Sequence, residues 1–379
     1  MGFAAMKIIN AIFLLLVLLM AGQVVATQVK PTAEKPAEKD DVIRVDTQLV
    51  DVPVAVIGAG GNAVAGLKKE DFKVFEDGKI QEIVDFSTAS EPFEVALLLD
   101  TSGSTRSDLQ LIQRAANEFI ASLRSGDRVS VTAYRSEVAD GRAFAVSETL
   151  SRLTGDRNAL RDAIAAAKMS GGTPLYDSLI QIVEEVFRDP PAGDFRGRRA
   201  LVALTDGVDS TSSAGFAEIK EKLGKLGIVC FFIKVDTREF FEEGLLGDCQ
   251  SATRFSAAQI RRYYRSLGAK GNYEKAASFC QLGEFERLAV SKKLYEIADA
   301  EMLELAKMSG GKVFPLAELS DARAAFKSVA DELGSKYTLG YYPSNEKRDG
   351  TYRKIRVEVR GQAPATQVRA RDGYTATKN

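Results

Sequence analysis

Hydrophobic and polar residues follow two different periods along this chain, and the change of period marks its parts. Residues 42–90 and 337–374 alternate in the manner of half-buried strands. Between them, short and nearly continuous apolar runs are combined with segments whose apolar residues recur every three or four positions. The runs are typical of buried parallel strands, and the recurring positions are typical of amphipathic helices. The pattern predicts an α/β fold: a doubly wound, mostly parallel sheet with flanking β-sandwich-like segments.

The central segment predicts a regular succession of strands and helices. Strands are expected at residues 95–99, 128–134, 200–205, 228–235 and, as a short edge strand, 312–315. A helix is expected at residues 178–187, after a turn at Thr173. Two further helices present apolar faces, the first formed by Leu109, Ile112, Ala116, Phe119, Ile120 and Leu123, and the last by Leu319, Ala322, Ala325, Phe326, Val329, Ala330 and Leu333.

The flanking segments predict strands separated by turns. Before the central segment, strands are expected at residues 50–56, 72–76 and 80–86, with Asp77-Gly78 as a hairpin turn. After it, they are expected at residues 337–343, 352–360 and 368–374. Gly58-Ala59-Gly60-Gly61 mimics a dinucleotide-binding fingerprint, but no helical pattern follows it. We therefore expect a glycine-rich hairpin turn at this position.

The alternation stops between Asp236 and about Lys293, and we interpret this stretch as a helical insertion. Its basic and aromatic residues form either a partner surface or a solvated helix face with tyrosines packed inward. Because the stretch follows a central strand, we also hypothesise that it lies near the carboxyl ends of the strands. These residues are Arg254, Arg261, Arg262, Tyr263, Tyr264 and Arg265.

Composition restricts the class of function. The chain has 379 residues, a formal net charge of −1 and no histidine. The absence of histidine excludes Ser-His-Asp triads, histidine general bases and histidine-ligated zinc. A near-neutral charge gives no indication of nucleic-acid binding. We expect no enzyme, because the chain also lacks a nucleophile elbow and a second carboxylate cluster.

The amino-terminal residues are typical of export. Residues 1–26 fit a secretory signal peptide, with Lys7 before an apolar core and a cleavage site at Val24-Val25-Ala26. A membrane anchor is the alternative, although the apolar run is short for a span. Residues 27–41 are expected to form a disordered linker. No later segment is apolar enough to cross a bilayer, so we expect a periplasmic or secreted protein.

Three cysteines are present. Cys230 lies in the apolar run 228–233 and is expected to be a buried free thiol. Cys249 and Cys280 lie in the polar insertion and could pair in an oxidising compartment, but spacing alone leaves the question open.

The candidate chemistry lies where apolar runs end. Asp100, Ser102 and Ser104 follow one strand, Thr173 lies in a glycine-containing turn, and Asp206 follows another strand. All five side chains offer hard oxygens, which suit Mg²⁺, Mn²⁺ or Ca²⁺. Taken alone, Asp100 and Ser102 also fit a helix N-cap in an ordinary loop. In open α/β sheets, however, ligands bind beyond the carboxyl ends of the strands.

This order of residues resembles the metal-ion-dependent adhesion site of von Willebrand factor A domains. The mature chain also resembles exported bacterial VWFA-related proteins of the acidobacterial type. That resemblance rests on the five residues and on the stretches 71–78, 171–177, 204–209 and 339–343. It implies that Asp100, Ser102, Ser104, Thr173 and Asp206 hold a divalent cation, most often Mg²⁺, some of them through water. By analogy with integrins, the two flanks could form one joint sandwich; two separate β modules are the alternative.

The sequence therefore predicts an exported, metal-dependent interaction module that captures an Asp or Glu carboxylate of a protein partner. The alternative is an envelope component whose loops are stabilised by the metal. The expected parts are a signal peptide (1–26), a linker (27–41), a β-rich segment (42–92), an A-type domain (93–335) with an insertion at about 237–293, and a second β-rich segment (336–379). The partner and the oligomeric state are not predicted.

Overall fold

The computed structural model describes residues 49–88, 91–103, 109–139, 141–191, 195, 198–268, 278–361, 363 and 365–378. All of them belong to one unit, Thr47–Asn379. The predicted signal peptide, the predicted linker and Ser104 lie outside the described residues. Within the described ranges, no helix is both long and apolar enough to cross a membrane.

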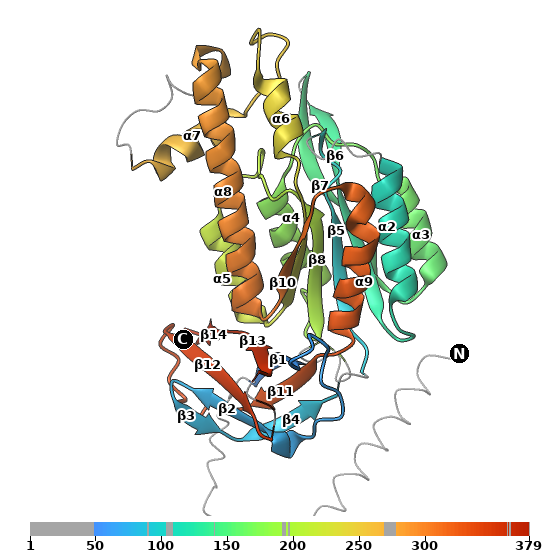
Figure 1. Cartoon of the computed structure of the whole chain (residues 1–379), viewed down its shortest axis with the longest axis vertical. Coiled ribbons are helices and arrows are strands. Elements are labelled where there is room, and N and C mark those ends of the chain that lie inside the picture. The colour runs from blue at the N-terminus through green and yellow to red at the C-terminus, as the bar shows by residue number, and fades with distance from the viewer. Residues whose placement is uncertain are drawn as a thin grey trace, which may run out of the picture. The chain divides into compact units, whose positions relative to one another are not determined.

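A six-stranded sheet forms the centre of the molecule, in the order β10-β9-β8-β5-β6-β7 (Figure 1). Its neighbouring strands are parallel, except that β7 runs antiparallel to β6. The strands are β5 (Glu94–Leu99), β6 (Arg128–Ala139), β7 (Arg142–Thr154), β8 (Arg199–Thr205), β9 (Val229–Val235) and β10 (Lys312–Leu316). Every residue of β5 and β8 is buried, which confirms that these apolar runs are central strands.

Helices cover both faces of this sheet, so the predicted doubly wound architecture is confirmed (Figure 1). The apolar residues of one face pack against α2 (Leu109–Ser122), α3 (Arg157–Ala166) and α9 (Ala322–Leu333), which follows the short turn η6 (Leu319–Asp321). The other face packs against α4 (Leu175–Gln181), the π-helical turn η3 (Ile182–Val186), α5 (Phe216–Leu226) and the carboxyl-terminal half of α8 (Glu284–Ser309). Helix α4 begins at Leu175 rather than Ser178, directly after Pro174 at its N-cap.

Two four-stranded sheets form the β-sandwich, and each contains strands from both flanks. One has the order β13-β1-β11-β4 and the other β14-β12-β2-β3, with a shared apolar core. The two flanks therefore form one joint sandwich and not two separate β modules. The elements are β1 (Val50–Ile57), η1 (Lys69–Asp71), β2 (Phe72–Glu76), β3 (Lys79–Gln81), β4 (Ile83–Ser87), β11 (Tyr337–Tyr341), β12 (Tyr352–Val359), β13 (Gln367–Ala370) and β14 (Gly373–Thr375).

Two strands predicted as single elements are each divided between the two sheets. The expected strand 80–86 breaks at Glu82 into β3 and β4, and the expected strand 368–374 breaks into β13 and β14. Gln81 and Ile83 are both buried, so the alternation of the sequence continues through the corner. A corner of this kind leaves no trace in a period of two, which explains why the sequence predicts uninterrupted strands.

The glycine-rich stretch after β1 is a tight turn, as predicted. The amide of Gly58 donates to the Asn62 oxygen, and the amide of Gly61 donates to the Gly58 oxygen, both at 2.9 Å. Ile57 and Ala63 then pair across the turn. No helix follows, so the dinucleotide-binding interpretation is excluded at this position.

The insertion after β9 consists of α6 (Arg238–Leu245), α7 (Ala257–Ser266), η5 (Phe279–Gln281) and the first half of α8. The expected end of the insertion near Lys293 falls inside α8. This helix continues without a break from the insertion into its carboxyl-terminal half, which covers the central sheet. The insertion has its own apolar cluster, and a disulfide joins Cys249 to Cys280. Cys230 is a buried free thiol, as predicted.

Buried basic side chains join the chain segments that connect the sandwich to the central sheet. Arg198 is fully buried and donates to the backbone oxygens of Glu91, Pro92 and Lys336 at 2.7, 3.1 and 3.2 Å. Lys336 is also fully buried; its Nζ donates to the Gly310 oxygen at 2.7 Å and lies 3.6 Å from Glu332. Burial, with a smaller contribution from the positive charge of Arg369, lowers the pKa of Lys336 to about 8, although the negative charge of Glu332 acts in the opposite direction.

We expect the stability of the wild type relative to a Lys336→Met variant to rise between pH 8 and pH 10. The folded state releases the proton of Lys336 near pH 8, whereas the unfolded state keeps it to about pH 10.5. The unfolded state binds more protons than the folded state in this pH window. The free-energy cost of burying the charge of Lys336 therefore decreases by about 1–2 kcal/mol as the pH rises. Urea unfolding at pH 7.5, 9 and 10 measures the difference. A difference that stays constant with pH would contradict the assignment.

Candidate metal site

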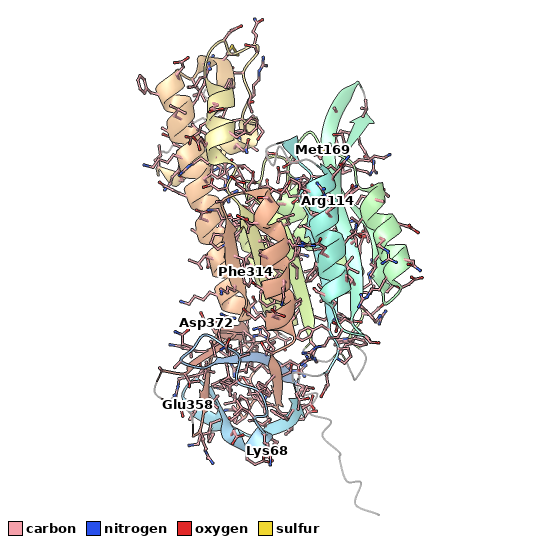
Figure 2. The ribbon with its side chains drawn as sticks, turned by 45° about the vertical axis from the view of Figure 1, so that its right-hand side comes forward. Lys68, Arg114, Met169, Phe314, Glu358 and Asp372 are labelled. Atoms are coloured by element: carbon pink, nitrogen blue, oxygen red, sulfur yellow. A yellow bond between two sulfur atoms is a disulfide. The ribbon has the colours of Figure 1, made fainter. Side chains whose placement is uncertain are left out.

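The two predicted carboxylates lie at the carboxyl ends of neighbouring parallel strands. Leu99 of β5 pairs with Leu204 of β8, and the amide of Asp100 donates to the Leu204 oxygen at 2.9 Å. The side chains of Asp100 and Asp206 are fully buried. Met169, next to the turn that carries Thr173, lies at this end of the sheet, whereas Lys68, Glu358 and Asp372 mark the sandwich at the other (Figure 2).

Asp100 is held by hydroxyl and amide donors. Its Oδ1 accepts the amide of Ser102 at 3.0 Å and the Ser102 hydroxyl, and its Oδ2 accepts the Thr205 hydroxyl at 2.6 Å. Burial raises the pKa of Asp100 to about 7, and the negative charge of Asp206 contributes to the increase. The hydrogen bonds from Ser102 and Thr205 act in the opposite direction. The site therefore concentrates negative charge that burial makes unfavourable.

The turn that carries Thr173 is joined to both neighbouring loops. The amide of Thr173 donates to the Ser210 hydroxyl at 2.8 Å, and the amide of Ser210 donates back to the Thr173 oxygen at 3.0 Å. The amide of Ser170 donates to the Thr101 oxygen at 2.8 Å. A side chain at Gly172 would meet Thr211 at 2.9 Å, so only glycine permits this approach. Asp100, Ser102, Thr173 and Asp206 thus lie on three interlocked loops.

Asp206 is anchored from both sides. Its Oδ1 accepts the amide of Val208 at 2.9 Å, and its Oδ2 accepts the Thr237 hydroxyl at 2.8 Å. Thr237 belongs to the insertion, where it precedes α6. The hypothesis that the insertion lies near the carboxyl ends of the strands is therefore confirmed.

Four further polar residues surround the predicted set, and the sequence analysis assigned none of them. Thr205 and Thr237 donate to the two carboxylates, as described above. Asp209 is buried and accepts the amides of Tyr176 and Ser212, each at 3.2 Å; burial raises its pKa to about 6. Tyr134 on β6 is buried, and its hydroxyl has no partner with hydrogen-bond geometry among the described residues. Only Thr205 and Asp209, which lie in the stretch 204–209, gave a signal in the sequence.

These residues fit a hard divalent cation. The pKa of Tyr134 is raised by burial and, to a smaller extent, by the negative charges of Asp100, Asp209 and Asp206. The phenol of Tyr134 is therefore close enough to all three carboxylates to interact with them electrostatically. The Tyr134 hydroxyl lies close to Thr205 and to these buried carboxylates, and it is a buried polar group that an ion and its water would satisfy. No cluster of three or more His, Cys, Asp or Glu side chains that could hold a metal occurs among the described residues, so any ion here depends on hydroxyls as well.

Residues 95–208 match the sequence model of the family described as von Willebrand factor type A domain. Residues 95–208 thus belong to a von Willebrand factor type A domain. The match includes all five predicted metal ligands and ends before the insertion. It therefore leaves the insertion, β10 and α9 outside the family pattern. No curated protein sequence matches the chain.

Solved structures with a similar fold are distant from this chain in sequence. Proximal thread matrix protein 1 of the mussel byssus is 14% identical, over 73% of this chain and 51% of that one, with a TM-score of 0.39. A von Willebrand factor type A protein from Catenulispora acidiphila is 13% identical over 88% and 75%, with a TM-score of 0.38. The mussel protein with a zinc-occupied MIDAS motif is 15% identical over 68% and 49%, with a TM-score of 0.40. This chain thus spans about half the length of the mussel protein, and the likenesses carry no functional argument.

Gly207, next to Asp206, has a backbone conformation and a neighbour that both disfavour a side chain. Its φ is +78°, and a Cβ there would lie 2.5 Å from Cε of Met302 on α8. We expect Gly207→Ala to lower the free energy of unfolding by about 1–2 kcal/mol from the backbone alone, and further because Met302 must move. Gly78→Ala is a matched control, since Gly78 has a φ of +82° with open space around it. Equal losses in the two variants, measured by urea unfolding, would contradict a close contact with α8.

Proposed function

We propose that this protein is an exported interaction module that captures a carboxylate of a protein partner through a divalent cation, most often Mg²⁺. The observation that carries the proposal is the convergence of Asp100 and Asp206, two fully buried carboxylates that lie close enough for the charge of Asp206 to raise the pKa of Asp100. Ser102, Thr173 and, outside the described residues, Ser104 complete the proposed ligand set. The residues named hold the ion, and the ion supplies the positive charge that an Asp or Glu side chain of the partner would meet.

The chain's own residues prepare this site. Ser102 and Thr205 donate hydrogen bonds that fix the orientation of Asp100, and Thr237 and the Val208 amide do the same for Asp206. Only two of the five proposed ligands are charged, so they would at most neutralise a divalent cation, and neutral hydroxyls and waters would fill the rest of its shell. A carboxylate from outside the chain could replace such a water. A histidine general base is excluded, because the chain has no histidine.

Export is part of the proposal. The apolar core in residues 8–20 supports a signal peptide. The disulfide between Cys249 and Cys280 is compatible with an oxidising compartment, where such bonds persist. Fractionation of the source cells, with an antibody against the protein, tests this part directly. Finding the full-length, unprocessed chain in the cytoplasm would contradict it.

Metal-dependent capture tests the binding function. Immobilised wild type and Asp100→Ala protein are each incubated with extracellular and envelope proteins of the source organism, in Mg²⁺ or in EDTA. We expect a partner that the wild type retains in Mg²⁺, releases in EDTA, and that the variant does not retain. Equal capture in Mg²⁺ and EDTA would contradict the proposal. A melting temperature lowered by EDTA without any metal-dependent capture would instead support a stabilising metal in an envelope component.

A further inference from the structure

The inward face of helix α8 contacts the loop that carries Asp206. Tyr295, Ala298 and Met302 are buried and follow the three- and four-residue spacing that places side chains on one helix face. Ala298 and Met302 lie directly over Gly207, where a Cβ would be 3.4 Å and 2.5 Å from their nearest atoms. The helix therefore closes one side of the candidate site, although it lies outside the matched family pattern.

A chain of hydrogen bonds connects the same helix face to the carboxylate. The Tyr295 hydroxyl lies 2.8 Å from Oγ1 of Thr237, and Oγ1 of Thr237 lies 2.8 Å from Oδ2 of Asp206. A threonine hydroxyl has one proton, and at Thr237 it is donated to Asp206. Tyr295 must therefore donate to Thr237. Burial and the charge of Asp206 raise the pKa of Tyr295, so its phenol keeps the proton that this direction requires.

A second link joins the insertion to the turn that carries Thr173. Arg262 of α7 donates to the hydroxyl of Tyr176 and to Glu301 of α8, and its guanidinium lies 5.2 Å from the centre of the Tyr176 ring. The Tyr176 amide donates to Asp209 at 3.2 Å. The insertion thus contacts the loops of both Thr173 and Asp206.

We propose that Thr237 and Tyr295 are positioning residues, which hold Oδ2 of Asp206 for the ion and couple the packing of α8 to ion binding. The inference rests on the proposed function, because it assigns the insertion a part in the same metal site. Since coupling between two events is reciprocal, ion binding must stabilise the packing of α8 as much as that packing strengthens ion binding. The insertion would then influence the ion affinity of a site whose proposed ligands all lie outside the insertion.

Titration with Mn²⁺ in a calorimeter compares the wild type with Tyr295→Phe. The variant keeps the ring and removes only the hydroxyl, and we expect its affinity for Mn²⁺ to be about three- to tenfold lower, the range of one hydrogen bond. Tyr264→Phe is the matched control: it removes a phenol that donates to Glu286 elsewhere in the insertion, and its affinity should equal that of the wild type. Equal affinities of Tyr295→Phe and the wild type would overturn the inference.

A pair of substitutions at Thr237 separates positioning from folding. Thr237→Ser keeps the hydroxyl and should retain the Mn²⁺ affinity of the wild type. Thr237→Val keeps the shape but removes the direct donor to Asp206, so its affinity should fall at least as far as that of Tyr295→Phe. A purely structural role would lower the thermal stability of both variants without this difference in affinity.

A double-mutant cycle in EDTA tests the coupling without any ion. The free energies of unfolding of the wild type, Tyr295→Phe, Asp206→Ala and the double variant should be non-additive, because the first substitution breaks a chain that ends at Asp206. If the wild type binds no Mn²⁺, the proposed function fails, and the cycle alone then decides whether Tyr295 and Asp206 are coupled. Additive losses would overturn the inference whatever the ion does.

Discussion

Replacing Asp100 by asparagine is expected to reduce the affinity for Mg²⁺ by more than about 100-fold and to leave the metal-free protein at least as stable as the wild type. Substitutions that only support a ligand already weaken metal sites by about 10- to 100-fold, and Asp100 is one of two charged ligands proposed here. The fold should survive, because Ser102 can still donate to the amide oxygen, whereas the Thr205 hydroxyl can rotate its proton away and accept a hydrogen bond from the amide NH2 group.

The sign of the stability change follows from the pKa of Asp100. Burial and Asp206 raise this pKa to about 7 in the folded state, against 3.8 for an ordinary Asp. Between about pH 4 and pH 7 the folded state binds more protons than the unfolded state, so the metal-free wild type loses stability as the pH rises. The neutral amide of the Asp100→Asn variant has no such cost. We expect the variant to gain roughly 1–3 kcal/mol relative to the wild type across this window when both are in EDTA.

Urea unfolding at pH 5 and pH 7.5, with and without Mg²⁺, measures both effects. Asp127→Asn is the matched control, since Asp127 is a buried carboxylate that accepts the amides of Phe93 and Arg124 at the opposite end of β6. It should leave Mg²⁺ binding unchanged. If Asp100→Asn bound Mg²⁺ as tightly as the wild type, Asp100 could not be a ligand.

Removing the disulfide by a double substitution of Cys249 and Cys280 with serine is expected to destabilise the insertion by about 2–4 kcal/mol. The bond closes a loop with a sequence separation of 31 residues, and a loop of this length restricts the unfolded chain substantially. The bond also holds together an apolar cluster that includes Phe255, Ile260 and Val290. Because the cluster is separate from the cores on the two faces of the sheet, the loss should be confined to α6, α7 and the first half of α8.

Hydrogen exchange resolved by residue measures this local loss. Amides of α7 should exchange about 30-fold faster or more in the double variant, whereas those of β5 and β8 should not change. The wild type treated with a reductant is the control, and it should match the variant, because Cys280 is exposed. Protection that is unaffected in α7 would show that the bond contributes nothing to the stability of the insertion.

The sequence predicted those features of the fold that depend on neighbouring residues. Continuous apolar runs identified β5, β8 and β9 because both faces of these strands are buried, and the spacing of apolar residues identified α2 and α9. The corner at Glu82 was missed, because a single strand was expected over residues 80–86. The local period continues there while the chain changes its packing partner, and only the partner reveals the change.

The same distinction between local patterns and distant contacts applies to the residues of the candidate site. Asp100 and Asp206 could be predicted because each ends a buried strand, and the order of strands in a parallel sheet brings such ends together. Tyr134, Thr237 and Tyr295 could not, since each reaches the site from a segment distant in the sequence and resembles an ordinary core or capping residue. Their roles follow from burial and from hydrogen bonds between segments whose packing no local pattern predicts.

Calorimetric titration of the mature wild-type protein with Mg²⁺ and with Mn²⁺ tests the central claim most directly. We expect one ion bound per chain, competition between the two ions for the same site, and no binding to Asp100→Ala. Failure of the wild type to bind either ion, in protein whose melting curve shows that it is folded, would contradict the claim that Asp100, Ser102, Ser104, Thr173 and Asp206 form a metal site.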